Sequence, residues 1–207
     1  MFFDREDAAR RLAERLMAYW GQNPLVLAIP RGAVRMGRII AERLKGEFDV
    51  VLVRKLRAPQ QPELAIGSVN ESGWTYLADY AQAYGADTAY IETEKRRQLQ
   101  TIARRRAQYT PIRAPRDPAG RIVIVIDDGL ATGATMISAL HGLRADKPAR
   151  LICAVPVAPP DTVAKVAALA DEVVCLQTPE FFQAVGQFYR HFDQVEDEEV
   201  IELLKGA

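Results

Sequence analysis

The sequence predicts an α/β protein built on a doubly wound, mainly parallel sheet. Short apolar runs rich in β-branched residues are typical of strands buried on both faces. Such runs span residues 25–29, 48–53, 122–126, 149–157 and 172–176. Segments with apolar residues at helical spacing separate most of these runs, and this alternation favours parallel strands joined by right-handed crossovers.

The N-terminal segment predicts a packing helix and then a candidate anion site. Asp4 can cap a helix over residues 5–20, whose apolar residues share one stripe. The first strand is followed by an "arginine turn", Pro30-Arg31-Gly32, and by an amphipathic helix. Gly32 allows close backbone approach and Arg31 adds positive charge, so this turn could hold an anion. A solvated turn residue is the alternative for Arg31.

The predicted strand at residues 48–53 is followed by the basic residues Arg54 and Lys55. In an open α/β sheet, ligands bind at the carboxyl ends of the strands. An ammonium group at this edge could offset the charge that builds up on a departing anion. An ordinary surface lysine is the alternative for Lys55.

The pattern changes over residues 56–118, which we expect to form an insertion. A polar, proline-containing loop at residues 58–62 is a candidate lid over the site. A hairpin is indicated around residues 70–73, and helices are indicated over residues 79–84 and 88–109. The proline-rich end of the insertion is expected to be a linker back to the sheet.

The helix predicted over residues 88–109 contains two basic clusters, residues 95–97 and 104–106. Such clusters can bind nucleic acid, but Glu92 and Glu94 lie at helical spacing from the first cluster and aliphatic residues mark a packed face. A solvated basic face is therefore favoured. A basic rim around an anionic substrate is the alternative.

The most informative stretch runs from residue 121 to residue 135 and reads RIVIVIDDGLATGAT. A buried strand ends on an "acidic pair", Asp127 and Asp128, and passes through a "glycine-rich loop" (residues 129–135) into a helix. Unpaired backbone N–H groups and the helix dipole can bind a phosphate at such a junction. The two carboxylates suit hydroxyl groups or a cation. An ordinary turn with capping aspartates is the alternative, but buried acids without a ligand are costly.

The C-terminal segment is rich in aromatic residues. They are Phe181, Phe182, Phe188, Tyr189 and Phe192, and a short helix is expected after them. Aromatic side chains beside a site could stack on a planar substrate. They could equally form the core of a small cap, which is the more frequent role of aromatic residues.

Composition narrows the function classes. The 207 residues allow one domain with a full core, and 27 basic residues balance 27 acidic ones, which gives no electrostatic footprint for nucleic acid or a membrane surface. Charges throughout residues 1–17 exclude a signal peptide, and no apolar run approaches the roughly 18 residues of a spanning helix, so a cytoplasmic protein is expected. Cys153 and Cys175 lie in apolar runs and are expected to be buried thiols.

The stretch from Val123 to Thr135 resembles the phosphoribosyl-diphosphate (PRPP) binding signature of the type I phosphoribosyltransferases. In that family an apolar strand is followed by two acidic residues, a short spacer and Thr-Gly-x-Thr. The resemblance implies that Asp127 and Asp128 bind the ribose hydroxyls and contact Mg²⁺, directly or indirectly. It assigns the 5′-phosphate to Ala131, Thr132, Gly133, Ala134 and Thr135, and the diphosphate to Pro30, Arg31 and Gly32, with Lys55 beside it.

The resemblance also implies a domain organisation. It covers residues 25–178 as the core, with residues 56–118 as insertion and lid. Residues 179–207, together with residues 1–20, would form the "hood" that selects the acceptor in this family. The whole chain is similar to bacterial phosphoribosyltransferase-domain proteins, but no purine-, orotate- or uracil-specific hood can be recognised, and a homo-oligomer is left open.

The resemblance implies a Mg²⁺-dependent enzyme that transfers the phosphoribosyl group of PRPP to a nitrogen nucleophile and releases diphosphate. A PRPP-binding regulator without transferase activity is the alternative. The balanced charge and the lack of a recognisable helix-turn-helix count against it, because such a regulator would normally bind DNA or RNA. PRPP synthesis from ATP is disfavoured because no internal repeat is found. A P-loop kinase or an NAD enzyme is disfavoured because neither glycine motif occurs.

Overall fold

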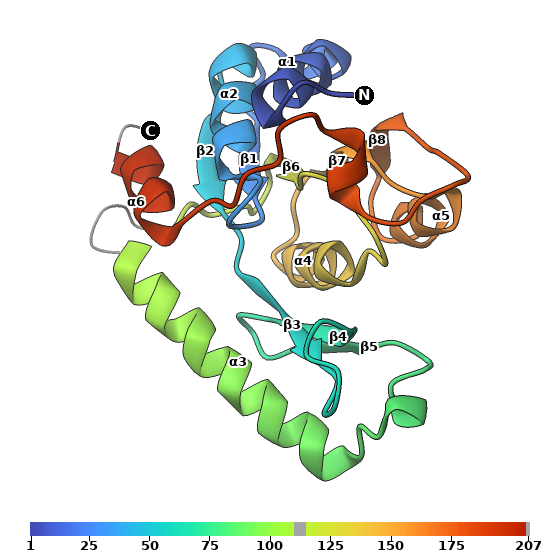
Figure 1. The fold of residues 1–207 in the computed structure, drawn as a ribbon. Coiled ribbons are helices and arrows are strands. Elements are labelled where there is room, and N and C mark those ends of the chain that lie inside the picture. Colours follow the sequence, from blue (N-terminus) through green and yellow to red (C-terminus); the bar gives the residue numbers. More distant parts are fainter. Residues whose placement is uncertain (110–114, 206–207) are drawn as a thin grey trace.

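The computed structural model describes residues 1–109 and 115–205. Its main sheet is parallel and has the strand order β2-β1-β6-β7-β8, which confirms the predicted doubly wound class (Figure 1). The chain winds outward in opposite directions from β1 and β6, so a ligand site is expected at the carboxyl ends of these two strands. The strands are β1 (Leu25–Ala28), β2 (Glu47–Val50), β6 (Ile122–Ile126), β7 (Arg150–Val157) and β8 (Glu172–Gln177).

Helices cover both faces of this sheet. α1 and α2 pack on one face, and α4 and α5 lie on the other (Figure 1). Their bounds are α1 (Arg5–Arg15), α2 (Val34–Leu44), α4 (Ala134–Ala145) and α5 (Pro160–Ala167). Asp4 caps α1 as predicted, because its carboxylate accepts from the backbone N–H of Asp7 at 2.8 Å. The helix predicted over residues 5–20 is shorter than expected, since its last part is a 3₁₀ turn, Met17–Tyr19.

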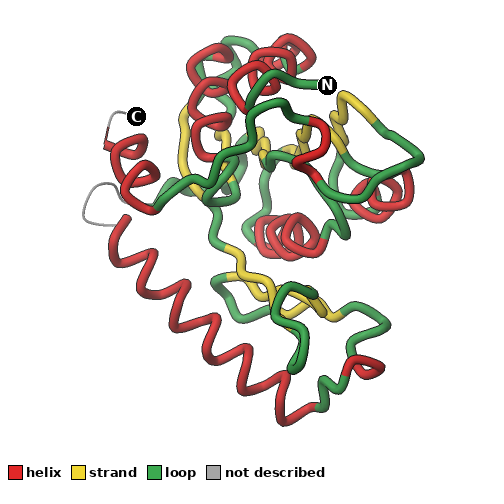
Figure 2. The backbone as a smooth tube through the Cα atoms, in the orientation of Figure 1, coloured by secondary structure: helices red, strands yellow, loops and turns green. Residues whose placement is uncertain are grey.

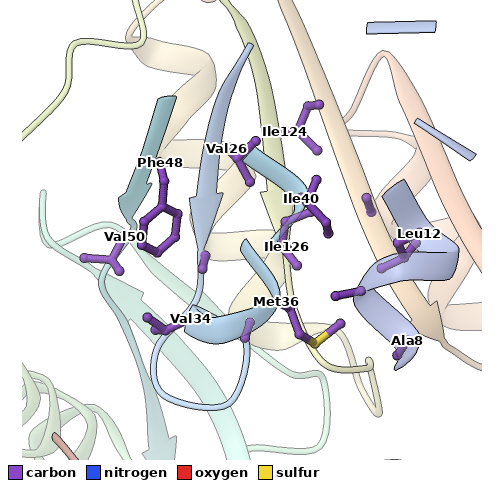
Figure 3. Packing of buried hydrophobic residues seen from close by; sticks show 14 of the residues in the cluster. Ala8, Leu12, Val26, Val34, Met36, Ile40, Phe48, Val50, Ile124 and Ile126 are labelled. Atoms are coloured by element: carbon purple, nitrogen blue, oxygen red, sulfur yellow. The ribbon is translucent and has the colours of Figure 1, made fainter. Parts of the chain in front are cut away.

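The all-apolar sequence of β6 serves two cores. Because successive side chains of a strand point to opposite faces, Ile124 and Ile126 pack beneath α1 and α2, whereas Val123 and Val125 pack toward α4. All four side chains are fully buried. Figure 3 shows the first core, between the sheet and helices α1 and α2. The strand that carries the acidic pair is therefore held from both sides.

The prediction of one strand over residues 48–53 was wrong in its extent. β2 ends at Val50, and the chain then leaves the main sheet and enters a three-stranded antiparallel sheet of order β3-β4-β5. The strands of this second sheet are β3 (Val53–Arg57), β4 (Ala65–Asn70) and β5 (Thr75–Leu77). Leu52 and Val53 are buried where the chain passes between the sheets, so hydrophobicity does not mark the point of departure.

The insertion forms an arm beside the main sheet, in which the long helix α3 (Thr88–Tyr109) lies against the second sheet (Figure 2). The predicted hairpin is confirmed by the antiparallel pairing of β4 with β5. The helix predicted over residues 79–84 is only a 3₁₀ turn, Gln82–Tyr84. The predicted linker lies partly outside the described residues, at 110–114.

Two expectations for the insertion concern its surface. The loop at residues 58–62 lines a small cavity of its own with Ala83, Tyr84 and Gly85, and its role as a lid stays a prediction. On α3, the side chains of Arg96, Arg97 and Arg104 are exposed, as a solvated basic face requires. Lys95, Arg105 and Arg106 are partly buried, and Arg105 and Arg106 form ion pairs with Asp197 and Glu71, so the prediction holds for only part of the two clusters.

Buried polar groups join the hairpin to α4. The Ser68 hydroxyl lies 2.6 Å from the backbone oxygen of Ala134 and is also hydrogen-bonded to the Ser138 hydroxyl. The Asn70 side-chain amide donates to the backbone oxygen of Ser138 at 3.1 Å. Because these side chains are at most 4% exposed, water does not compete for these bonds. The first turn of α4 is thus fixed against the insertion.

The two ends of the chain lie together. The backbone N–H of Phe2 donates to the oxygen of Phe188 at 2.7 Å, and Arg190 N–H donates to the oxygen of Phe2 at 3.0 Å. The expected C-terminal helix is α6 (Asp197–Lys205), which packs against α2 and α3. These contacts bring residues 1–20 and the C-terminal segment to one side of the sheet, while their assignment as a hood stays a prediction.

The two cysteines and the helix lengths bear on two further expectations. Cys153 and Cys175 are both free; Cys153 is fully buried and Cys175 is partly buried. Burial raises the pKa of both thiols, so neither is a reactive thiolate. Within residues 1–109 and 115–205, no helix has the length and apolar character needed to cross a membrane.

Candidate active site

A cavity of about 520 Å³ opens at the carboxyl ends of β1 and β6. It brings together the arginine turn, the acidic pair, the glycine-rich loop and Lys55, so every site residue predicted from the sequence borders it. Its remaining wall comes from the two ends of the chain. The residues of that wall are Arg5, Val185, Phe192, Asp193, Gln194 and Val195.

The acidic pair lies at the inner end of this cavity. Burial and the neighbouring carboxylate of Asp128 raise the pKa of Asp127 well above its ordinary value, although a hydrogen bond from the Thr135 side chain opposes the rise. Burial also raises the pKa of Asp128, against the opposing charge of Arg5. Asp127 also accepts from the backbone N–H of Asp128 at 2.9 Å. A cation or hydroxyl donors from a ligand would relieve the desolvation of these carboxylates.

The glycine-rich loop lines the cavity along its whole length. Gly133 has φ of +77°, a left-handed conformation that favours glycine, and it is the N-cap of α4. Among the described residues, no protein acceptor pairs with the backbone N–H groups of Ala131, Thr132, Gly133 or Thr135. Together with the start of the α4 dipole, these donors can bind a phosphate.

Thr162, at the start of α5, supports this loop from behind. Its hydroxyl donates to the backbone oxygen of Ala131 at 2.7 Å, and its side chain is only 4% exposed. A Cβ added at Gly133 would lie 2.8 Å from the Thr162 methyl carbon. Thr162 therefore restricts both the conformation of the loop and the space behind it.

Replacing Thr162 with valine is expected to weaken binding of a phosphate ligand and to lower stability by about 1–2 kcal/mol, because the shape is kept while the Ala131 carbonyl loses its donor. Thermal unfolding and ligand titration would measure both effects. Thr93→Val, which removes an exposed hydroxyl on α3, is the control. Equal behaviour of the two variants would exclude a supporting role for Thr162.

The arginine turn borders the acidic pair directly. A Cβ added at Gly32 would overlap Asp128 Oδ2, so only glycine fits against this carboxylate. The peptide bond between Pro30 and Arg31 is cis. The Arg31 guanidinium forms an exposed ion pair with Glu196 at 3.0 Å, which is a weak interaction that an anion could replace.

Lys55 reaches the cavity by a different route from the predicted one. It is not at the end of a parallel strand but within β3, where it lies opposite Ser68 of β4. Its side chain is exposed to the cavity, and its positive charge lowers the pKa of both Asp127 and Asp128. The predicted location in the sheet was therefore wrong, whereas the proximity to the acidic pair was expected.

Of the five aromatic residues named in the C-terminal segment, Phe192 alone lines the cavity, and its side chain is 37% exposed. Phe182 and Phe188 stack on each other, and Tyr189 is buried. Phe192 lines the cavity, but the Arg5 guanidinium carbon lies 3.9 Å from its ring centroid, and Tyr189 packs 4.9 Å away. Phe181 is 88% exposed and does not border the cavity. The arrangement favours packing over stacking on a substrate.

Sequence reasoning missed Arg5, Thr162 and Tyr189. Arg5 Nε donates to Asp128 Oδ2 at 2.9 Å, and the Tyr189 hydroxyl donates to the backbone oxygen of Asp128 at 2.6 Å. No local motif marks these residues, because Arg5 is separated from Asp128 by 123 positions and Tyr189 by 61. Only the tertiary fold brings them to the acidic pair.

Comparisons with known proteins agree with this geometry. The family model of the phosphoribosyl transferase domain matches residues 3–193. Two curated Mycobacterium tuberculosis proteins, from different strains and each named "Putative phosphoribosyl transferase", are 43% identical over 208 residues; the match covers 100% of this chain and 47% of each relative. The chain thus spans about half the length of the curated relatives it matches.

One solved structure is similar to this chain over nearly the full length of both. The TT1426 protein of Thermus thermophilus is 44% identical, with a TM-score of 0.82, and the match covers 100% of this chain and 99% of that chain. The parallel sheet with a glycine-rich loop after an acidic pair, and a family model that matches nearly the whole chain, lead to one conclusion: this chain belongs to the phosphoribosyl transferase domain family.

Proposed function

We propose that this protein transfers the phosphoribosyl group of PRPP to a nitrogen nucleophile and releases diphosphate. The observation that carries the proposal is the glycine-rich loop, which lines a cavity beside two carboxylates and in which the backbone N–H groups of Ala131, Thr132, Gly133 and Thr135 lack protein acceptors in the described part of the chain. This combination provides donors for a phosphate and acceptors for sugar hydroxyls, which are the two polar parts of a ribose 5-phosphate.

Each part of the site has a task in this reaction. The loop from Ala131 to Thr135 anchors the 5′-phosphate, Asp127 and Asp128 accept from the ribose hydroxyls, and the arginine turn with Lys55 holds the diphosphate. The bond from C1 to diphosphate breaks with its electron pair on the leaving oxygen, and the lone pair of the acceptor nitrogen forms the new bond to C1. The protein contributes positioning and charge stabilisation, so no general base is assigned.

The acidic pair also fits the Mg²⁺ that the family implies. Within the described residues, no group of three or more His, Cys, Asp or Glu side chains could hold a metal ion by itself. Magnesium usually takes one or two carboxylates and completes its octahedral shell with water and substrate oxygens, and two buried carboxylates beside a cavity satisfy that requirement. When bound, Mg²⁺ would neutralise charge on the diphosphate. Asp127 is the better candidate ligand because Arg5 already pairs with Asp128.

The acceptor would enter between the reacting carbon and the wall formed by the two chain ends. The alternative function is a PRPP-binding regulator that uses the same cavity without catalysis. Incubation with PRPP, Mg²⁺ and a panel of nucleobases and other nitrogen nucleophiles, with diphosphate release as the readout, separates the two. PRPP binding with no diphosphate formation from any acceptor would favour the regulator, and no PRPP binding would refute both.

Binding of PRPP with Mg²⁺ is expected to release protons from the protein. Because Asp127 and Asp128 have raised pKa values in the free protein, part of their population is protonated at a pH where a free aspartate is fully ionised. The cation and the ribose hydroxyls favour the ionised forms, so affinity should rise with pH through these pKa values. Calorimetry in buffers of different ionisation enthalpy measures the proton count, and proton uptake would contradict the assignment.

A further inference from the structure

Arg5 connects the N-terminal helix to the centre of the site. Its Nε donates to Asp128 Oδ2 at 2.9 Å, and its Nη1 donates to the backbone oxygen of Asp193 at 2.7 Å. Its guanidinium also lies over the Phe192 ring, with 3.9 Å from Cζ to the centroid. Three groups from distant parts of the chain therefore fix its position.

The contact of Arg5 with Asp128 is more protected than the ion pair of the arginine turn. The two side chains are 14% and 16% exposed, whereas those of Arg31 and Glu196 are 28% and 59% exposed. A charge-assisted hydrogen bond gains strength where water is partly excluded. Arg5 is also close to the arginine turn, since a Cβ added at Gly32 would lie 3.2 Å from its Nε.

The two carboxylates of the acidic pair consequently have different surroundings. Asp128 has a guanidinium partner through a hydrogen bond, and the Tyr189 hydroxyl holds its backbone oxygen. Asp127 accepts from the backbone N–H of Asp128, and no ion pair involves it among the described residues. Arg5 thus orients one oxygen of Asp128 and leaves the other available to a ligand.

We propose that Arg5 is a positioning residue for the ribose of PRPP: it holds the Asp128 carboxylate in the orientation in which this group accepts from a ribose hydroxyl. The inference rests on the proposed function. It gives the N-terminal helix a direct part in sugar binding, in addition to its packing role. It also predicts that the guanidinium stays on Asp128 when PRPP binds.

The test compares Arg5→Gln and Arg5→Lys with Arg10→Gln. Arg10 lies on the same helix and makes only an exposed ion pair with Glu6 at 3.5 Å, so it controls for loss of a positive charge on α1. Affinity for PRPP with Mg²⁺ is measured by calorimetry at neutral pH, and thermal unfolding is recorded for each variant.

Arg5→Gln is expected to weaken PRPP binding by roughly tenfold or more, as loss of one charge-assisted contact would do. Arg5→Lys should recover only part of the affinity, since lysine keeps the charge but not the planar fork that bonds Asp128 and Asp193 together. Arg10→Gln should match the wild type.

Three outcomes would overturn the inference. Unchanged affinity in Arg5→Gln would make the ion pair purely structural, and tighter binding would show that Arg5 blocks the ribose site. A structure of the wild-type protein with bound PRPP would also overturn the inference if the Arg5 guanidinium no longer contacted Asp128. Absence of PRPP binding by the wild type would instead refute the proposed function.

Discussion

The double variant Asp127→Asn and Asp128→Asn is expected to lose Mg²⁺-dependent PRPP binding, by roughly 100-fold or more, while the fold is retained. Neutral amides cannot hold the cation, and they replace charged acceptors for the ribose hydroxyls with weaker ones. Both side chains face the cavity rather than the two hydrophobic cores, so the packing around β6 is not disturbed.

The same variant should differ from the wild type in how its stability depends on pH. The folded-state pKa values of Asp127 and Asp128 are raised, so the folded protein binds protons more tightly than the unfolded chain. Their contribution to stability therefore decreases as pH rises from the unfolded value of about 4 through the raised values. The ligand-free double variant has no such carboxyl groups, so its stability should not show this decrease. Relative to the wild type it should therefore become more stable as pH rises toward neutrality.

Thermal unfolding with and without PRPP and Mg²⁺, across pH, measures both expectations. Asp146→Asn is a matched control, because Asp146 is an exposed residue at the opposite end of α4. A ligand-induced rise in melting temperature that persists in the double variant would remove the ribose and cation assignments. If Asp146→Asn also lost the ligand-induced rise in melting temperature, the loss of binding would not be specific to the acidic pair.

Gly32→Ala is expected to disrupt the site from the other side. The new methyl group would overlap Asp128 Oδ2 and lie 3.2 Å from Arg5 Nε, so the buried ion pair must separate or the arginine turn must shift. Such overpacking typically costs about 1–3 kcal/mol. The accompanying loss of PRPP affinity should be roughly tenfold or more, because the ribose acceptor is displaced.

A double-mutant cycle identifies the cause of that loss. Adding Asp128→Ala to Gly32→Ala removes the carboxylate with which the new methyl group collides. The double variant should therefore be destabilised by less than the sum of the two single variants. PRPP affinity should stay low, because the acceptor is then absent. Strictly additive stability effects, measured by denaturant unfolding, would mean that Gly32 does not act through Asp128.

Local sequence predicted the parts of the site that lie on consecutive residues. The run from residue 122 to residue 126 is apolar because both faces of β6 are buried, and the loop after it consists of small residues that would let backbone N–H groups approach a ligand. These requirements act within a few positions, so they are visible in the chain itself. The arginine turn was predicted for the same reason.

The remaining parts depend on contacts between distant residues. Nothing near Arg5 or Thr162 in sequence indicates that one contacts Asp128 and the other supports Ala131. The boundary between β2 and β3 was missed because Leu52 is as buried as the strand residues before it. Lys55 was predicted near the diphosphate position from resemblance, and its path there through the second sheet could not be read from hydrophobicity.

The bonds from Ser68 and Asn70 to the first turns of α4 have a mechanical consequence. Lys55 lies on the strand paired with Ser68, so the cation that would face the leaving group and the helix that would carry the sugar phosphate are coupled as one rigid body. Closure over a substrate by a swing of the whole arm would break these buried bonds. Any gating motion of the insertion should therefore be confined to the connection between β3 and β4, residues 58–64, whose backbone can move without disturbing the relative placement of the two charges.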